Sequence, residues 1–538
     1  MLTIATLLTS LTILYSNMAV ASVSVSGIIN SDTVWTKASS PYSLTGNVLV
    51  NSGVRLTVEP GVVVNLNGFY IMVNGTLQAR GTSGDRVVFN GEGSITFTQS
   101  SISWNEQAGS GCIIEYANLD SAQIGISSVS PKIISSSIKT LTLSGSPTVS
   151  NNIIHSGVFL SSESQPQITG NTITGLFQVS YSSAGSPVIS HNTINSGITI
   201  GGQGTGSVSI SYNTIKGEIN AQGVRVFIQN NAINGKISIS GGTSSSAAAT
   251  ITDNTISASE TAIDIAIGLV SDTHAIILNN RITAGDTGIN IGPGMTTTFY
   301  GGVNNATIIG NTISGCQTAA ILVASSSTQG GHTPRPNTAT IEKNTLTSNN
   351  YGVKSMGTAY IRGNMITGNH VGVYGGSLVQ YNTITNNDYG ILASSNIAHN
   401  NIHNNILYNI HLGNTELGFA QTSNVNAANN WWGTTDPSAI KASIFDFEED
   451  FTLGKVTFEP FLSQPELEAT PESFESTPIN VPTPAPSQSP TAPPNQTPTP
   501  TTTPNPLSEQ TLLAIIGAAI AVIVLGAGLA LTVHLAKK

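Results

Sequence analysis

The sequence has little charge and few aromatic side chains, and these shortages exclude several classes of protein. Only 9% of the 538 residues are charged and 6% are aromatic, whereas about 25% of an average soluble protein is charged. The net charge is −10 and there is no basic patch, so nucleic acid is not expected as a partner. Ser, Thr, Asn and Gly are abundant instead, a composition typical of secreted or cell-surface β proteins.

Long apolar runs occur only at the two ends of the chain. Residues 2–14 are apolar and lead to Ala19-Val-Ala21, which predicts a signal peptide, residues 1–21, cleaved before Ser22. Residues 511–533 form an uncharged apolar run long enough to cross a bilayer.

This second run predicts a transmembrane helix over residues 509–536, followed by a two-lysine tail at 537–538. Positive charge on such a short tail places it in the cytoplasm. We therefore expect a single-pass type I membrane protein at the cell surface, with the membrane as a partner. Residues 463–508 are dense in Pro and Thr and predict an extended stalk, since such a segment cannot bury a core.

A tripeptide Asn-x-Ile, with Leu346 once in place of Ile, recurs through the middle of the chain. Its spacing has a minimum of 18 residues and reaches 33, which indicates a solenoid whose coils tolerate insertions. The asparagines of the repeat are Asn152, Asn171, Asn192, Asn213, Asn231, Asn254, Asn280, Asn311, Asn344, Asn364, Asn382 and Asn400.

A second element, such as Tyr351-Gly-Val or Tyr389-Gly-Ile, follows seven residues after the asparagine in later repeats. Each coil is therefore expected to carry two short strands with inward aliphatic residues, and stacked parallel coils form a β-helix. Asparagine tolerates the left-handed backbone region of a tight turn, and its amide can donate and accept along the stack. We interpret these residues as a structural ladder; ligand binding is the alternative.

The two cysteines, Cys112 and Cys316, lie about eight coils apart in such a fold, or roughly 40 Å at ~4.8 Å per coil. A disulfide needs Cα atoms within about 7 Å. We expect two free, packed thiols.

Three blocks of sequence resemble a known family. An opening block of alternating apolar residues between glycine turns precedes the Asn-x-Ile coils, and Asn429-Asn-Trp-Trp-Gly433 closes them. Together, over roughly residues 44–462, they resemble right-handed parallel β-helix repeat proteins, including the NosD-like group. The resemblance implies an all-β, right-handed parallel β-helix solenoid. The group mixes adhesins, structural surface proteins, copper-maturation factors and polysaccharide enzymes, so the resemblance leaves function open.

The expected organisation is a β-helix over residues 22–462 between the signal peptide and the stalk. It divides into irregular first coils at 22–140, regular coils at 141–428 and a C-terminal cap at 429–462. An open solenoid end exposes a strand edge, so Trp431 and Trp432 are interpreted as cap residues, with sugar stacking as the alternative. The N-glycosylation sequons begin at Asn74, Asn305 and Asn495.

Aligning the second strands of the coils predicts one outward column of side chains. The column is Asp264, Asn290, Leu322, Lys354, Tyr374, Leu392 and His411. The longest insertions, residues 292–305 and 324–337, lie beside it and carry His332 and Arg335. A groove there, with Asn290, His332, Arg335 and Tyr374, is the expected binding surface.

Few residues in or near this column could take part in catalysis. A glycosidase needs two carboxylates around one bond, and a calcium-assisted lyase needs an acid cluster beside a base. The candidates are Asp264, Asp272, Asp286 and Lys354. His399 and His403 belong to the one histidine cluster and are the candidate metal ligands. No cofactor is indicated.

The sequence favours a non-catalytic structural or adhesive surface protein that binds glycans or envelope components. An extracellular polysaccharide lyase or glycoside hydrolase, working near Asp264, is the first alternative. A NosD-like copper-handling accessory protein is the second.

Overall fold

The computed structural model describes residues 22–469 apart from short gaps. The gaps are residues 162–163, 182–184, 204, 243–244, 267–270, 293–303, 326–336 and 415–417. The predicted transmembrane helix, most of the predicted stalk and the sequon at Asn495 lie outside the described residues. In the part that is described, no helix is both long enough and apolar enough to cross a membrane.

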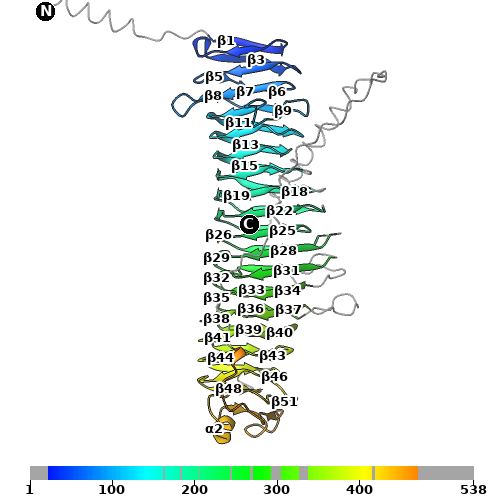
Figure 1. Cartoon of the computed structure of the whole chain (residues 1–538), viewed down its shortest axis with the longest axis vertical. Coiled ribbons are helices and arrows are strands. Elements are labelled where there is room, and N and C mark those ends of the chain that lie inside the picture. The colour runs from blue at the N-terminus through cyan, green and yellow to red at the C-terminus, as the bar shows by residue number, and fades with distance from the viewer. Residues whose placement is uncertain are drawn as a thin grey trace, which may run out of the picture. The chain divides into compact units, whose positions relative to one another are not determined.

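Residues 22–469 form a rod of stacked coils, as Figure 1 shows, and nearly all the pairs between coils are parallel. A representative coil consists of β31 (Thr273–Leu278), β32 (Arg281–Ala284) and β33 (Thr287–Gly292). Each pairs with its equivalent one coil further on. The predicted parallel β-helix is confirmed.

The prediction of two strands per coil was wrong, because each regular coil has three. The missed strand precedes the asparagine, as in β31 or in β37 (Thr338–Glu342). It carries no fixed marker residue, only inward apolar side chains at alternate positions. A pattern without a recurring residue does not stand out against the Asn-x-Ile and Gly-Ile markers.

The three strands of each coil build three faces, which we call sheets 1, 2 and 3 in chain order around the coil. Sheet 1 runs from β2 (Thr33–Trp35) to β46 (Ile397–Ala398), and sheet 2 ends at β47 (Asn401–His403). Sheet 3 ends at β52 (Ile444–Phe445). Near the N-terminus, strands such as β3 (Tyr42–Val50) run through the corner and belong to both sheets 2 and 3.

The twelve repeat asparagines form one continuous ladder of hydrogen bonds at the corner between sheets 1 and 2. In Asn171, Nδ2 donates to the carbonyls of Val149 and Thr169 at 3.0 and 3.1 Å. It also donates to Oδ1 of Asn192 at 2.9 Å, and the same oxygen accepts the backbone N–H of Asn171. The pattern continues from coil to coil and ends on Asn430, so the closing Asn-Asn-Trp-Trp-Gly block supplies the last rung.

The left-handed residue of each turn is the one before the ladder asparagine, which corrects the expectation from the sequence. Examples are Asn151, His191 and Tyr381, with φ of 57°, 57° and 56°. This residue turns the chain so that the next side chain points into the corner, where it is almost fully buried. The asparagine is therefore selected for its three-way hydrogen bonding rather than for its backbone freedom.

A second, shorter asparagine ladder, which the sequence analysis missed, lies at the corner between sheets 2 and 3. Asn349, Asn369, Asn387 and Asn405 each follow a repeat asparagine by five residues. The Nδ2 of each of the first three donates to the Oδ1 of the next at 2.9–3.0 Å. Cys316 holds the equivalent position one coil earlier, and its N–H donates to Asn349 Oδ1 at 3.1 Å.

The core is a stack of aliphatic side chains along the axis. The Ile or Leu of every Asn-x-Ile motif is at most 3% exposed. Cys112 and Cys316 are buried and free, as expected. Burial raises the pKa of Cys112 to about 11 and that of Cys316 to about 12, so neither is a reactive thiolate at neutral pH.

The C-terminal end of the rod is closed by the short helix α2 (Pro437–Ala442), β52 and the loop after them. Trp432 is 3% exposed and packs edge-on to Phe458, while Trp431 extends the ladder of β47. The chain then turns back onto sheet 2, because Asn401 bonds both the N–H and the carbonyl of Glu466. The first residues of the predicted stalk, 463–469, are therefore packed against the rod.

The cap covers the end of the predicted outward column. The strand pairs place Asp264, Asn290, Leu322, Lys354, Tyr374, Leu392 and His411 in one row, so the predicted register is confirmed. His411 nevertheless lies under Phe445, with ring centroids 4.3 Å apart, and is 2% exposed. Its Nδ1 accepts the N–H of Gly413. Burial lowers the pKa of His411 to about 4.

The ladder can be tested by replacing Asn254 with alanine. Asn254→Ala leaves the buried N–H of Asn231 and the carbonyls of Ile228 and Thr252 without their partner. We expect it to lower the free energy of unfolding by about 3 kcal/mol, since each orphaned buried group costs roughly 1–3 kcal/mol. Urea unfolding followed by circular dichroism measures this.

The matched control is Thr255→Ala, one residue further on, whose side chain is exposed on sheet 2. Its loss should stay within about 0.5 kcal/mol. Equal losses in the two variants would contradict a stabilising role for the ladder.

The buried histidine predicts that the cap loses stability in acid. The folded-state pKa of His411, about 4, is below the ordinary 6.5, so proton binding favours the unfolded cap. The contribution of neutral His411 to the free energy of unfolding of the cap is fully present above pH 6.5. It falls by up to about 3 kcal/mol as the pH drops to 4. His411→Phe keeps the stacking and should remove this part of the pH dependence, measured as denaturation midpoints from pH 7 to 4. Parallel profiles for the two proteins would contradict the assignment.

Candidate functional site

The four catalytic candidates do not form one site. Asp264 pairs with Lys236 at 3.7 Å and accepts Asn290 Nδ2 at 3.0 Å. Lys354 lies three coils away, roughly 14 Å at ~4.8 Å per coil, and its Nζ sits 4.7 Å from the ring centre of Tyr351.

The other two acids lie in turns rather than in the column. Asp286 follows β32 and accepts the hydroxyls of Thr287 and Thr318. Asp272 precedes β31, and its backbone carbonyl accepts the N–H of Ala247. Asp264, Asp286 and Lys354 thus have separate partners.

Only part of the predicted groove lies within the described residues. His332 and Arg335 lie outside the described residues. Asn290 is occupied by Asp264, and Tyr374 packs edge-on between Tyr351 and Phe419, with centroids 6.0 and 5.4 Å away.

The candidate metal ligands have different surroundings. His399 Nδ1 lies 3.2 Å from Glu466 Oε2, and its ring stacks on Tyr381. Burial lowers the pKa of His403. Across the described part of the chain, no group of three or more His, Cys, Asp or Glu side chains could hold a metal ion.

Two of the predicted sequon asparagines are described. Asn74 is half-buried, and its Oδ1 accepts the hydroxyl of Thr98 at 2.8 Å. Asn305 lies on sheet 1, in register between His274 and Thr338.

A pocket of about 500 Å³ lies at the N-terminal end of the rod, on the outer face of sheet 1. It is formed across β4 (Arg55–Val58), β7 (Thr76–Arg80) and β10 (Ile113–Glu115) and the turns after them. Its polar lining consists of Thr57, Glu59, Gln78, Arg80, Thr82, Ser83, Glu115 and Tyr116.

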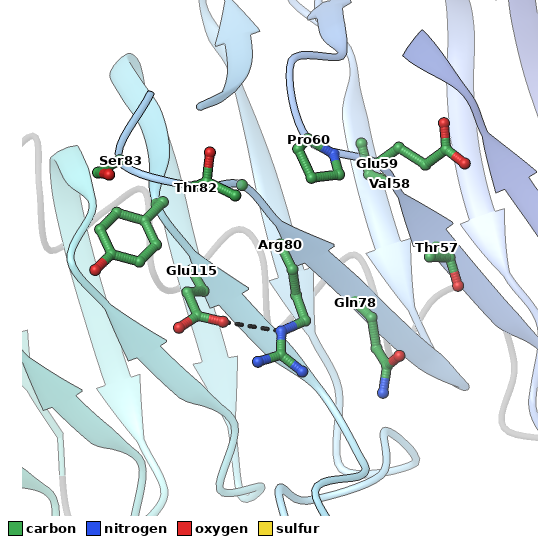
Figure 2. A pocket seen from close by; sticks show the side chains of 11 residues that line it. Thr57, Val58, Glu59, Pro60, Gln78, Arg80, Thr82, Ser83 and Glu115 are labelled. Carbon is green, nitrogen blue, oxygen red and sulfur yellow. Dashed lines mark hydrogen bonds and ion pairs between the residues drawn. The ribbon is translucent and has the colours of Figure 1, made fainter. Parts of the chain in front are cut away.

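Arg80 is the central side chain of the pocket. It faces Glu115 on the neighbouring strand, as Figure 2 shows, and its Nε lies 2.8 Å from Glu115 Oε2. The strands place the two residues directly opposite each other, so the ion pair follows from the register. A guanidinium carries five N–H donors, and this contact engages one of them.

A hairpin beside the pocket supplies an aromatic ring. The segment between β9 (Gly93–Phe97) and β10 folds back on itself through Asn105 and Ser110. It is held to the next coil by the N–H of Trp104, which donates to Ser130 O at 2.9 Å. Gly111 closes the hairpin at φ 107°, where an added Cβ would lie 2.2 Å from Ser103 O.

Trp104 lies between two cations. Arg80 Cζ is 5.9 Å and Lys132 Nζ 5.7 Å from its ring centre. Lys132 also pairs with Glu106 at 2.6 Å, and the indole N–H donates to the same carboxylate. The hydrogen bond from Lys132, followed by that from Trp104, lowers the pKa of Glu106. The ring is thus fixed at one edge, and cation–π attraction holds Arg80 beside it.

The sequence analysis missed this site. An insertion between two paired strands marks this site in the sequence. Gln78 and Ile113 pair directly although 35 positions separate them, whereas the paired residues Leu56 and Leu77 are 21 positions apart. The insertion lies before the first Asn-x-Ile motif, where no regular spacing exists to reveal it.

One comparison with known proteins supports the architecture. A family model described as a right-handed beta helix region matches residues 298–432. The search of curated proteins gives no match.

Two solved structures are similar to this chain at 12% sequence identity. One is a mannuronic acid specific polysaccharide family 6 lyase from human gut microbiota, with a TM-score of 0.27, over 59% of this chain and 82% of that one. The other is a mutant of the periplasmic alginate epimerase AlgG, with a TM-score of 0.23, over 65% of this chain and 73% of that one.

Proposed function

We propose that this chain, a right-handed parallel β-helix repeat protein, is a non-catalytic cell-surface protein that binds glycans at its N-terminal pocket. The predicted signal peptide would export the chain, and the predicted Pro/Thr-rich stalk and membrane helix at residues 509–536 would hold the rod outside the cell.

The observation that carries the proposal is a pocket lined by Arg80 and Gln78, with the ring of Trp104 beside it, 5.9 Å from Arg80 Cζ. Arg80 and Gln78 line the pocket with N–H donors, one of which Gln78 already gives to Gly111 O at 3.2 Å, and Thr57 and Thr82 add hydroxyls. Sugar hydroxyls accept such donors, and an aromatic ring packs on the apolar face of a sugar. Rigid aromatic and fixed polar groups around a concave surface are typical of a specific binding site.

The same contacts favour binding over catalysis. Two carboxylates line the pocket, and each is already engaged by the protein. Glu115 pairs with Arg80, and Glu59 Oε2 accepts the N–H of Lys37 at 3.0 Å. A glycosidase needs one free acid and one free base or nucleophile on opposite sides of the bond.

Glycan binding can be tested by replacing Trp104. Trp104→Ala should weaken binding about tenfold or more, because a lost stacking ring of about 1.4 kcal/mol corresponds to a factor of ten. A glycan array identifies the bound sugar, and titration of that oligosaccharide against wild-type and variant protein measures the change.

A second variant tests the guanidinium. Arg80→Lys keeps the positive charge but removes the planar guanidinium with its several N–H donors, so it should also weaken binding in the same titration.

The matched control is Tyr360→Ala, an aromatic residue of sheet 1 that is 44% exposed and far from the pocket. It should leave affinity unchanged. Equal losses from Trp104→Ala and Tyr360→Ala would place the binding surface elsewhere. Release of new reducing or unsaturated ends from the bound glycan would contradict a non-catalytic role.

A further inference from the structure

The first strand of the rod has one open edge. β1 (Val23–Ile29) pairs in parallel with β3, and no other described strand pairs with it. The opposite end of the rod is closed by α2 and the residues around it. In Figure 1 the described chain begins with β1 at one end of the rod, and α2 lies at the other. A terminal coil needs such a cover, because an open edge is a template for further pairing.

The hydrogen bonds of β1 show which backbone groups face this edge. The N–H of Val23 donates to Pro41 O at 2.9 Å, and the carbonyl of Ile29 accepts from Asn51 at 3.1 Å, so both face the inner neighbours. Successive residues of a strand point their N–H and C=O to alternate sides. Ser24 and Ile28 therefore present their N–H and C=O groups to the open edge, on either side of the register shift between Val25 and Gly27.

The edge has few of the features that normally prevent strand pairing. Residues 22–31 contain no charged residue and no proline, although edge strands are usually protected from pairing by charge or proline. The nearest carboxylate, Asp32, accepts the N–H of Arg55 at 2.9 Å. Val23, Ile28 and Val34 of this coil are 40%, 59% and 52% exposed.

We propose that β1 pairs with β1 of a second copy of this chain, joining two rods head to head. A neutral strand meets its own copy without charge repulsion, and cross-strand neighbours on the second β1 would partly cover the exposed side chains of Val23 and Ile28. A two-fold axis across the end makes the two β1 strands antiparallel, and such an isologous contact closes on itself as a dimer.

The second copy is the occupant because of where the chain begins after processing. Cleavage before Ser22 leaves one residue ahead of β1, which cannot cover the edge. The inference rests on this predicted cleavage and does not depend on the glycan pocket.

The experiment uses the full chain, expressed with its own N-terminus and purified from membranes in mild detergent. Mass spectrometry reads the first residue, and light scattering gives the oligomeric state. Spin labels on Ser24→Cys should lie close together across the dimer. Labels on Ser257→Cys, exposed on sheet 2 eleven coils from β1, should be roughly 110 Å apart at ~4.8 Å per coil. Pairing through the membrane helix alone would not bring the Ser24→Cys labels together.

The pairing itself is tested by blocking the edge. Ser24→Pro removes an edge N–H without removing a bond to β3, and Ile28→Lys places like charges opposite each other. The double variant should weaken self-association at least about tenfold, with an unchanged urea midpoint. The control Ser24→Ala should dimerise like the wild type. A monomeric wild-type protein, distant Ser24→Cys labels, an undiminished dimer in the double variant, or residues 1–21 retained at the N-terminus would each overturn the proposal.

Discussion

From Asn152 to Asn430, the rod depends on the hydrogen bonding of a buried asparagine that is repeated once per coil. Its amide joins three coils at a corner where backbone carbonyls would otherwise lose their partners, since Asn171 reaches Val149, Thr169 and Asn192 at once. Aspartate lacks the N–H donors that this amide supplies. The left-handed residue before it, rather than the asparagine, sets the turn. The loops can therefore vary in length, while the asparagine at the corner cannot be exchanged for another residue without losing these hydrogen bonds.

A ladder of this kind stabilises the middle of a solenoid but not its ends. At the C-terminal end, Asn430 supplies the last rung and the cap then buries Trp432 and His411. The return of Glu466 onto Asn401 fastens the exit of the chain to sheet 2. At the N-terminal end, Trp35 stacks on Tyr42 at 5.0 Å and closes the core, yet the backbone edge of β1 stays open. The C-terminal end is thus closed by a cap, whereas the N-terminal end covers its core but leaves a strand edge open.

How far the sequence predicts the structure depends on whether a feature recurs. The motif residues gave the parallel β-helix and the register of the column from Asp264 to His411. The strand before each asparagine was missed because its inward residues vary. The second ladder was missed because Asn349 and its equivalents occur in few coils. The burial of His411 could not be foreseen, since Phe445 reaches it from a segment without any repeat.

The candidate site lies where periodicity is weakest, and there is a physical reason for this. A regular coil uses its corner side chains to hold its neighbours, and its outward residues form flat rows of short polar groups. A concave surface needs an insertion, such as the hairpin that carries Trp104 beside Arg80. At the first coils such an insertion lies close to the open edge of β1. Head-to-head pairing would place the two pockets roughly 34 Å apart along the axis, about seven coil spacings between their β7 strands. A repetitive polysaccharide could then be held at two points, and the second binding event would be intramolecular.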